Sequence, residues 1–179
     1  MCVIIAKDKG ARMPSMSILR AAWLANPHGI GFVSTNGYYW RGMSFNEFKS
    51  RIKCVGTGDA CIIHFRYATH GSHKVSNCHP FRHNDLYFAH NGVLPVRTYN
   101  DMTDSETVFR NRIVPVYEAH GIGSKEFEDV VLENIHTSRF AFLKGQNVFL
   151  FGPFRQINGV WYSNTHWMPY RQQNYDYAR

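Results

Sequence analysis

The chain has 179 residues, of which 44% are hydrophobic and 18% are charged, and this balance is typical of a globular protein rather than a disordered one. No apolar run approaches the length needed to cross a membrane, which argues against a membrane protein. The formal net charge of +7 would suit an anionic partner such as nucleic acid, but no block of consecutive basic residues supports one, so a solvated basic surface is the preferred interpretation.

The cysteines indicate a reducing compartment. Cys2, Cys54, Cys61 and Cys78 show no CxxC spacing, and no signal peptide precedes them. Free thiols in the cytoplasm are therefore predicted, rather than a framework of disulfides.

Short strands and helices alternate in the first part of the chain. Residues 1–6 form an apolar run that suits a buried strand. Apolar side chains recur at helical spacing from Ser15 to Leu24, behind a Ser that can cap a helix. We also expect strands at 31–34 and 38–41 around an Asn-Gly turn, a helix from Ser44 to about Ile52, and a strand from Cys61 to Ala68.

The second part of the chain continues this mixed pattern. Pro115 should kink or split the helix that Thr103 caps. Residues 171–179 are polar and are expected to be loose. Other expected elements are a hairpin of strands 80–83 and 86–90, a helix at 124–135, and strands at 140–143, 148–151 and 160–162. Without repeats or a linker, this order predicts one α+β domain over residues 1–179 with mainly antiparallel sheet.

Cys2 is the most informative residue for chemistry. An initiator methionine is readily removed before a small side chain, and the product would carry a thiol and an α-amine on the same residue. A free α-amine has a pKa of about 8, so it can serve as a general base near neutral pH, through a bridging water. A buried cysteine in the first strand is the competing interpretation, and Cys2 alone would leave that one favoured.

Polar groups elsewhere fit the recognition of an amino acid and its amide. Arg66 ends a strand with Thr69 close behind, and its guanidinium matches a carboxylate, although a surface ion pair would also explain it. Asn91 and Gly92 offer an amide donor and an accessible backbone N–H that suit an oxyanion hole, although an ordinary turn has the same sequence. Asp104 could bind a substrate ammonium, or simply support a helix start.

Taken together, these segments resemble the class II glutamine amidotransferase domain, because its motifs occur here in the same order. The stretches that carry the resemblance are Met1-Cys2-x-Ile4, Asn26-Pro27-x-Gly29-x-Gly31, His64–Gly71, Asn77-x-His79-Pro80-Phe81, His90-Asn91-Gly92-Val93 and Thr103-Asp104-Ser105-Glu106. One such motif is weak, but the ordered set is specific.

The resemblance implies a four-layer αββα sandwich, the N-terminal-nucleophile hydrolase fold. It also implies an enzyme that needs no cofactor, which attacks glutamine through Cys2, forms a γ-glutamyl thioester and releases ammonia. By the same resemblance, Arg66 binds the α-carboxylate with the substrate-binding residue Thr69 nearby, and Asp104 binds the α-amine. Asn91 and Gly92 form the oxyanion hole, and His70 and His79 shape the pocket.

Three functions stay open on the sequence. The chain could deliver ammonia to a separate synthetase subunit, or it could act alone as an amidohydrolase on a γ-glutamyl compound. A catalytically idle relative, kept to bind nucleic acid for instance, is the third, but such a protein would not need the intact set Cys2, Arg66, Asn91, Gly92 and Asp104.

Several histidines lie close together in the sequence, so we also considered whether they form a metal site. Zinc sites use well-spaced ligands, and no HxxxH or CxxC pair is found in this stretch. We therefore predict no metal from the ligands considered, His64, His70, His73, Cys78, His79 and His90.

Overall fold

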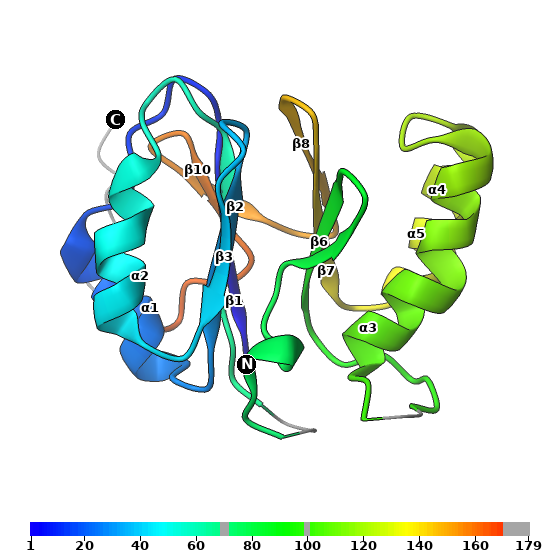
Figure 1. The fold of residues 1–179 in the computed structure, drawn as a ribbon, viewed down its shortest axis with the longest axis horizontal. Coiled ribbons are helices and arrows are strands. Elements are labelled where there is room, and N and C mark those ends of the chain that lie inside the picture. Colours follow the sequence, from blue (N-terminus) through cyan, green and yellow to red (C-terminus); the bar gives the residue numbers. More distant parts are fainter. Residues whose placement is uncertain (69–71, 99–100, 170–179) are drawn as a thin grey trace.

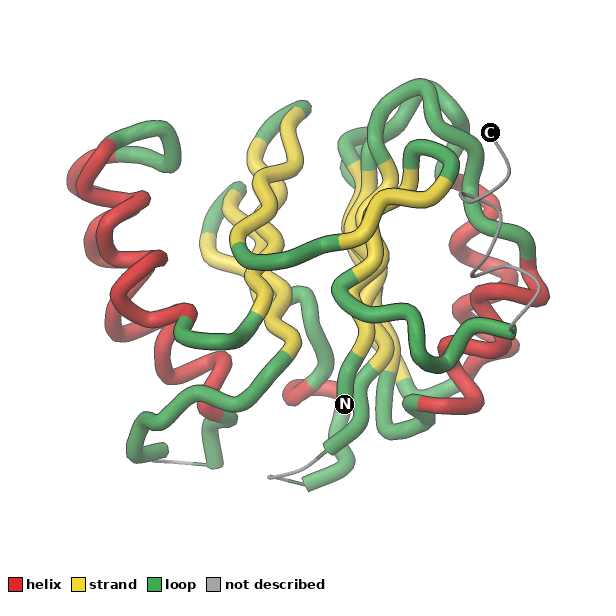
Figure 2. The backbone as a smooth tube through the Cα atoms, turned by 180° about the vertical axis from the view of Figure 1, so that it is seen from behind, coloured by secondary structure: helices red, strands yellow, loops and turns green. Residues whose placement is uncertain are grey.

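Two antiparallel sheets lie face to face between two groups of helices in the computed structural model, which describes residues 1–68, 72–98 and 101–169 (Figure 1). Seen from behind, the helices again form the two outer layers and the strands the two inner ones (Figure 2). The predicted α+β sandwich of four layers is thus confirmed. The tail at 171–179 that the sequence predicts to be loose lies outside the described residues.

The larger sheet has six strands in the order β3-β2-β4-β1-β10-β9. All its strand pairs are antiparallel, and the helices α1 (Met16–Ala25) and α2 (Phe45–Arg51) cover its outer face (Figure 1). A short 3₁₀ turn, Ile52–Cys54, extends α2. The strands are β1 (Val3–Lys7), β2 (Ile30–Ser34), β3 (Tyr39–Gly42), β4 (Cys61–Phe65), β9 (Arg155–Ile157) and β10 (Val160–Tyr162).

The smaller sheet has four strands in the order β5-β6-β7-β8, and every pair is again antiparallel. Its outer face is covered by one long helical segment and by α5 (Figure 1). The elements are β5 (Phe81–His83), β6 (Leu86–Asn91), β7 (Arg139–Lys144), β8 (Asn147–Phe151), α3 (Asp104–Val108), α4 (Val114–His120) and α5 (Lys125–Ile135), with a short 3₁₀ turn, Val75–Asn77, before β5.

Pro115 lies inside the long helical segment, where the sequence predicts a kink or split. The chain forms a π-helical turn, Phe109–Ile113, directly before α4, and Pro115 occupies the first turn of α4. A proline has no N–H to donate and its ring crowds the carbonyl four residues earlier, so a locally widened helix accommodates it without a break.

Three apolar layers hold the sandwich together. The outer two pack helices onto a sheet, with Leu19 and Phe48 on one side and Phe127 and Val131 on the other. The middle layer joins the two sheets through small and branched side chains, namely Ile4, Val33, Ile62, Ala89, Ala141 and Leu143. The alternation of side chains along each strand produces this division, because successive residues point to opposite faces.

Strand register brings Cys2 to the end of the sheets where the motifs gather. Val3 pairs with Phe65, so Cys2 lies beside the segment that follows β4. The predicted strand Cys61–Ala68 ends earlier, at Phe65, and two residues later the N–H of Tyr67 donates to Cys2 Sγ instead of to a strand partner. The N terminus and the beginning of α3 lie at this same end (Figure 1).

One strand escaped the sequence analysis. Residues 155–157 form β9, which pairs with β10 across a turn at Asn158 and Gly159. Both turn residues have positive φ, 52° and 76°, as a tight hairpin turn requires. Among the described residues, no helix is both long and apolar enough to span a membrane.

Candidate active site

Cys2 is held at the mouth of a small pocket by the backbone of Tyr67. The N–H of Tyr67 donates to Cys2 Sγ at 3.3 Å, and the carbonyl of Tyr67 lies 3.5 Å from the same sulfur. Burial raises the pKa of the thiol, while the Tyr67 hydrogen bond and the nearby Arg66 charge act in the opposite direction. The thiol therefore needs a base before it can attack, because the thiolate is the reactive form.

Arg66 is buried, with 3% of its surface exposed, although it follows directly on the end of β4. Its backbone N–H donates to the carbonyl of Gly29 at 2.8 Å, which continues the ladder between β4 and β2 by one bond. One guanidinium nitrogen donates to the carbonyl of Ser72 at 3.1 Å. A buried, oriented guanidinium beside the Cys2 pocket is suited to an anion.

Asn91 is the last residue of strand β6 on the other sheet, and Gly92 follows it. The Asn91 side chain is buried, and its Nδ2 donates to Ser163 Oγ at 2.8 Å, while its Oδ1 has no partner among the described residues. Gly92 has a φ of 148°, and a Cβ there would lie 2.1 Å from Ser138 Oγ. Only glycine fits this position, and it lines the pocket directly.

Asp104 enters the pocket from the first residue of α3. Its carboxylate accepts from the backbone N–H groups of Leu94 and Ser105, both at 2.8 Å. Thr103 caps the helix by accepting from the N–H of Glu106 at 3.2 Å, as the sequence predicts. The cap and the two amide donors fix the carboxylate in one orientation.

Three buried histidines form a connected floor, and two of them, His79 and His90, line the pocket. The rings of His64 and His79 contact each other at a tilt, with centroids 4.3 Å apart, and His64 Nε2 contacts the carbonyl of His90 at 3.0 Å. His90 Nδ1 contacts Ser105 Oγ at 2.7 Å, which ties this floor to the Asp104 region. Burial lowers the pKa of His64 to about 3 and that of His90 to about 4, and holds the pKa of His79 well below its usual value.

The pocket joins residues that are far apart in the sequence. Its open space is only about 30 Å³, enough for one or two water molecules. Met1 precedes Cys2 in this chain, so the α-amine is not on Cys2. The lining residues are Cys2, Arg66, Tyr67, Ala68, His79, His90, Gly92, Thr103, Asp104 and Ser105.

The sequence analysis anticipated much of this set. Five of the predicted residues line one pocket, namely Cys2, Arg66, His79, Gly92 and Asp104. Asn91 immediately precedes Gly92 in the sequence. Thr69 and His70, also predicted, lie outside the described residues. Within the described part of the chain, no group of His, Cys, Asp or Glu is arranged to hold a metal ion.

Ser163 and Asn164 were missed, although both support the site. Ser163 Oγ accepts from the N–H of Ile4 and from Asn91 Nδ2, each at 2.8 Å. Asn164 Nδ2 donates to the carbonyl of Cys2 at 2.8 Å. A polar pair directly after a short apolar strand was the available signal, but its meaning depends on β10 pairing with β1.

Comparisons with known proteins agree with this geometry. Residues 53–131 match the family of class-II glutamine amidotransferases, whereas no curated protein sequence matches significantly. Among solved structures, the allosteric regulatory enzyme of purine biosynthesis superposes with a TM-score of 0.60 and 15% sequence identity. The aligned region covers 93% of this chain and 42% of that enzyme, so this chain spans less than half its length, and the low identity shows a shared fold alone. Residues 53–131 are therefore similar to the class II glutamine amidotransferases, and the chain as a whole shares the fold of that solved enzyme.

Proposed function

We propose that this chain is a single glutaminase domain in which Cys2, once Met1 is removed, hydrolyses the side-chain amide of glutamine. One observation carries the proposal. The sulfur of Cys2 faces the backbone N–H of Tyr67 at 3.3 Å, in a pocket shared with Arg66, Gly92 and Asp104. A nucleophile, a cation, an anion and a backbone N–H thus surround one small space.

The reaction follows from these groups. The new α-amine of Cys2 accepts the thiol proton, through a water, and the sulfur attacks the amide carbon of glutamine. The amide oxygen becomes an oxyanion, which Gly92 N–H and the Asn91 side chain stabilise. The C–N bond then breaks, the leaving nitrogen takes the proton and departs as ammonia, and a γ-glutamyl thioester remains. Water hydrolyses the thioester to glutamate and restores the thiol.

Arg66 and Asp104 hold the amino-acid end of the substrate. The guanidinium pairs with the α-carboxylate, and the carboxylate pairs with the α-ammonium. Asp104 is prepared for this role because Leu94 and Ser105 already fix its orientation. An open space of about 30 Å³ is smaller than glutamine, so the lining around Tyr67 and Ala68 must move aside when the substrate binds.

The proposal includes a use for the ammonia. We expect a separate synthetase chain to accept it, since the family match and the fold concern the glutaminase step. An amidohydrolase that acts on another γ-glutamyl compound is distinguished by its substrate range, because it would release an amine other than ammonia.

The test measures processing and turnover on the same sample. Intact mass should show a chain that begins at Cys2, and this protein should release ammonia from glutamine. Cys2→Ala should abolish release while thermal unfolding stays cooperative. Arg66→Lys keeps the charge but loses the two-pronged geometry, so it should raise KM more than it lowers kcat. Full activity in a chain that retains Met1 would refute the α-amine as base.

A further inference from the structure

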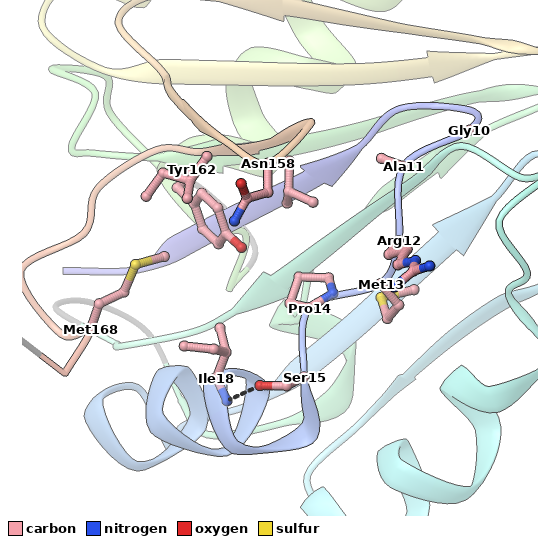
Figure 3. Close-up of a pocket in the computed structure, with 12 residues that line it drawn as sticks. Gly10, Ala11, Arg12, Met13, Pro14, Ser15, Ile18, Asn158, Tyr162 and Met168 are labelled. Atoms are coloured by element: carbon pink, nitrogen blue, oxygen red, sulfur yellow. Dashed lines mark hydrogen bonds between the residues drawn. The ribbon is translucent and has the colours of Figure 1, made fainter. Parts of the chain in front are cut away.

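A second cavity lies on the outer side of the six-stranded sheet and shares no lining residue with the candidate active site. Its volume is about 570 Å³, within the range of small-molecule sites. The loop 10–15, the first turn of α1, the β9–β10 hairpin and Met168 surround it (Figure 3). It is therefore built by segments from both ends of the chain.

Tyr162 places a polar group inside this cavity. The residue is 5% exposed, and its hydroxyl has no hydrogen-bond partner among the described residues. Figure 3 shows the hydroxyl directed into the cavity, on the side of Pro14 and Ile18. Burial raises the pKa of Tyr162 to about 12, so the hydroxyl remains a hydrogen-bond donor across the neutral range. No protein group among the described residues uses this hydroxyl, so it can donate to a ligand in the cavity.

The remaining walls are apolar. Met13, Pro14, Ile18, Val160 and Met168 contribute aliphatic and thioether surface to the cavity. Such a lining suits a ligand that has a compact hydrocarbon body, because methionine side chains adapt to its shape.

The electrostatic environment of the cavity is positive. Arg12 is the sole charged residue in its lining, and it forms no ion pair within the described part of the chain. The first turn of α1 contains no acidic residue, so the positive end of this helix dipole is not offset locally. Asn158 adds an exposed amide at the rim. Each of these features favours an anion.

We propose that this cavity binds a small organic acid with an apolar body, such as an aromatic or branched aliphatic carboxylate. The hydrocarbon body of the ligand occupies the space between Pro14 and Val160 and packs against these apolar side chains. The carboxylate accepts from the guanidinium of Arg12 and from the Tyr162 hydroxyl. The site is independent of glutamine hydrolysis, and it goes beyond the proposed glutaminase reaction.

Calorimetric titration of the full chain tests the proposal, with 3-phenylpropionate as the probe. We expect saturable binding of this acid, and binding at least roughly tenfold weaker for 3-phenylpropylamine, which keeps the body but reverses the charge. The acid should bind equally well to Cys2→Ala, so the measurement does not depend on glutaminase activity. Absence of saturable binding to folded protein, or equal affinity for acid and amine, would overturn the proposal.

Two conservative variants locate the binding. Arg12→Gln and Tyr162→Phe should each weaken the affinity for 3-phenylpropionate, roughly tenfold, because each removes one donor to a charged group. Arg20→Gln removes an exposed cation from α1 outside the cavity and should leave the affinity unchanged. Thermal unfolding of each variant confirms that it is folded. Unchanged affinity in both folded cavity variants, or an equal loss in Arg20→Gln, would show that the acid binds elsewhere.

Discussion

At the scale of single residues, the environment of each cysteine sets its reactivity. Cys61 is fully buried, and burial raises its pKa to about 12, while Cys78 is also buried and its pKa is raised. Cys2 is partly exposed and lies at the mouth of the pocket, although burial also raises its pKa in the unprocessed chain. The thiolate is the reacting form, so the α-amine that processing would release is what should distinguish Cys2.

A glutamine analogue that carries a diazo-ketone should therefore label Cys2 alone in the processed chain. Peptide mass spectrometry after labelling locates the adduct. Cys54 is the fairest internal control, because it too is partly exposed but lies outside the pocket. Labelling of Cys54 together with activity that survives Cys2→Ala would contradict the assignment.

Asn91 illustrates what the sequence could and could not predict at this scale. The His-Asn-Gly motif indicated an amide donor beside a permissive backbone, and Gly92 does line the pocket with positive φ. The motif did not reveal that Asn91 Nδ2 donates to Ser163 at 2.8 Å. That partner is 72 residues away in the sequence, and strand pairing alone brings it near.

Comparison of Asn91→Ala with Ser163→Ala tests the oxyanion role. If Asn91 stabilises the oxyanion, its loss should lower kcat and kcat/KM together by about 10²–10³. Ser163→Ala removes the group that positions the amide and also the acceptor of the Ile4 N–H, so it should lower stability, but its loss in kcat should be smaller. Steady-state kinetics and thermal unfolding are measured on the same preparations. A destabilised Asn91→Ala protein with normal turnover would mean that this residue is only structural.

At the scale of secondary-structure elements, helix caps were readily predicted because they depend on local sequence. The predicted caps Ser15, Ser44 and Thr103 each accept a hydrogen bond from a backbone N–H in the first turn of the helix that follows, and Ser124, which was not predicted as a cap, does the same for α5. The hairpin of β9 and β10 was missed, although Asn158-Gly159 is a strong turn signal. The strand at 160–162 was predicted, but β9 is only three residues long, too short for alternation to be recognised.

Two of these caps allow a matched prediction. Thr103→Ala and Ser124→Ala each remove one cap, and each should lower the free energy of unfolding by about 1 kcal/mol. Only Thr103 lies beside Asp104 in the pocket, so only Thr103→Ala should also raise KM for glutamine. Urea unfolding and steady-state kinetics check the pair. An equal rise in KM from Ser124→Ala would show that the effect is general destabilisation.

At the scale of the whole molecule, the sandwich brings the site together from both sheets. Cys2 and Arg66 belong to the six-stranded sheet and its continuation, whereas Asn91 and Gly92 belong to the end of the four-stranded one. Composition and periodicity predicted α+β with antiparallel sheet, but they contain no information on which strands pair across the chain. The four-layer arrangement was predicted only from the resemblance to a known family, which rests on the order of the motifs.

The three buried histidines beside the pocket give the molecule a predictable response to acid. In the folded state the pKa values of His64 and His90 are about 3 and 4, and that of His79 is also well lowered, whereas an unfolded histidine titrates at about 6.5. Between these values the unfolded chain binds protons that the folded chain does not. The contribution of these histidines to the free energy of unfolding is therefore fully present above about pH 6.5. As the pH is lowered towards 4, the free energy of unfolding falls by on the order of 1.4 kcal/mol per pH unit for each histidine.

Urea unfolding at several pH values between 7 and 5 measures this slope. His79→Phe should reduce it by the contribution of one histidine, since both ring nitrogens of His79 lack partners among the described residues and its ring packs on Phe81 with centroids 4.5 Å apart. His120→Gln removes an exposed histidine outside the cluster and serves as the matched control. A stability that does not change between pH 7 and 5, or an equal change of slope in both variants, would mean that the cluster takes up protons without unfolding. The structure around the cluster would then open locally to admit water, because a charged imidazole in a buried position requires solvation.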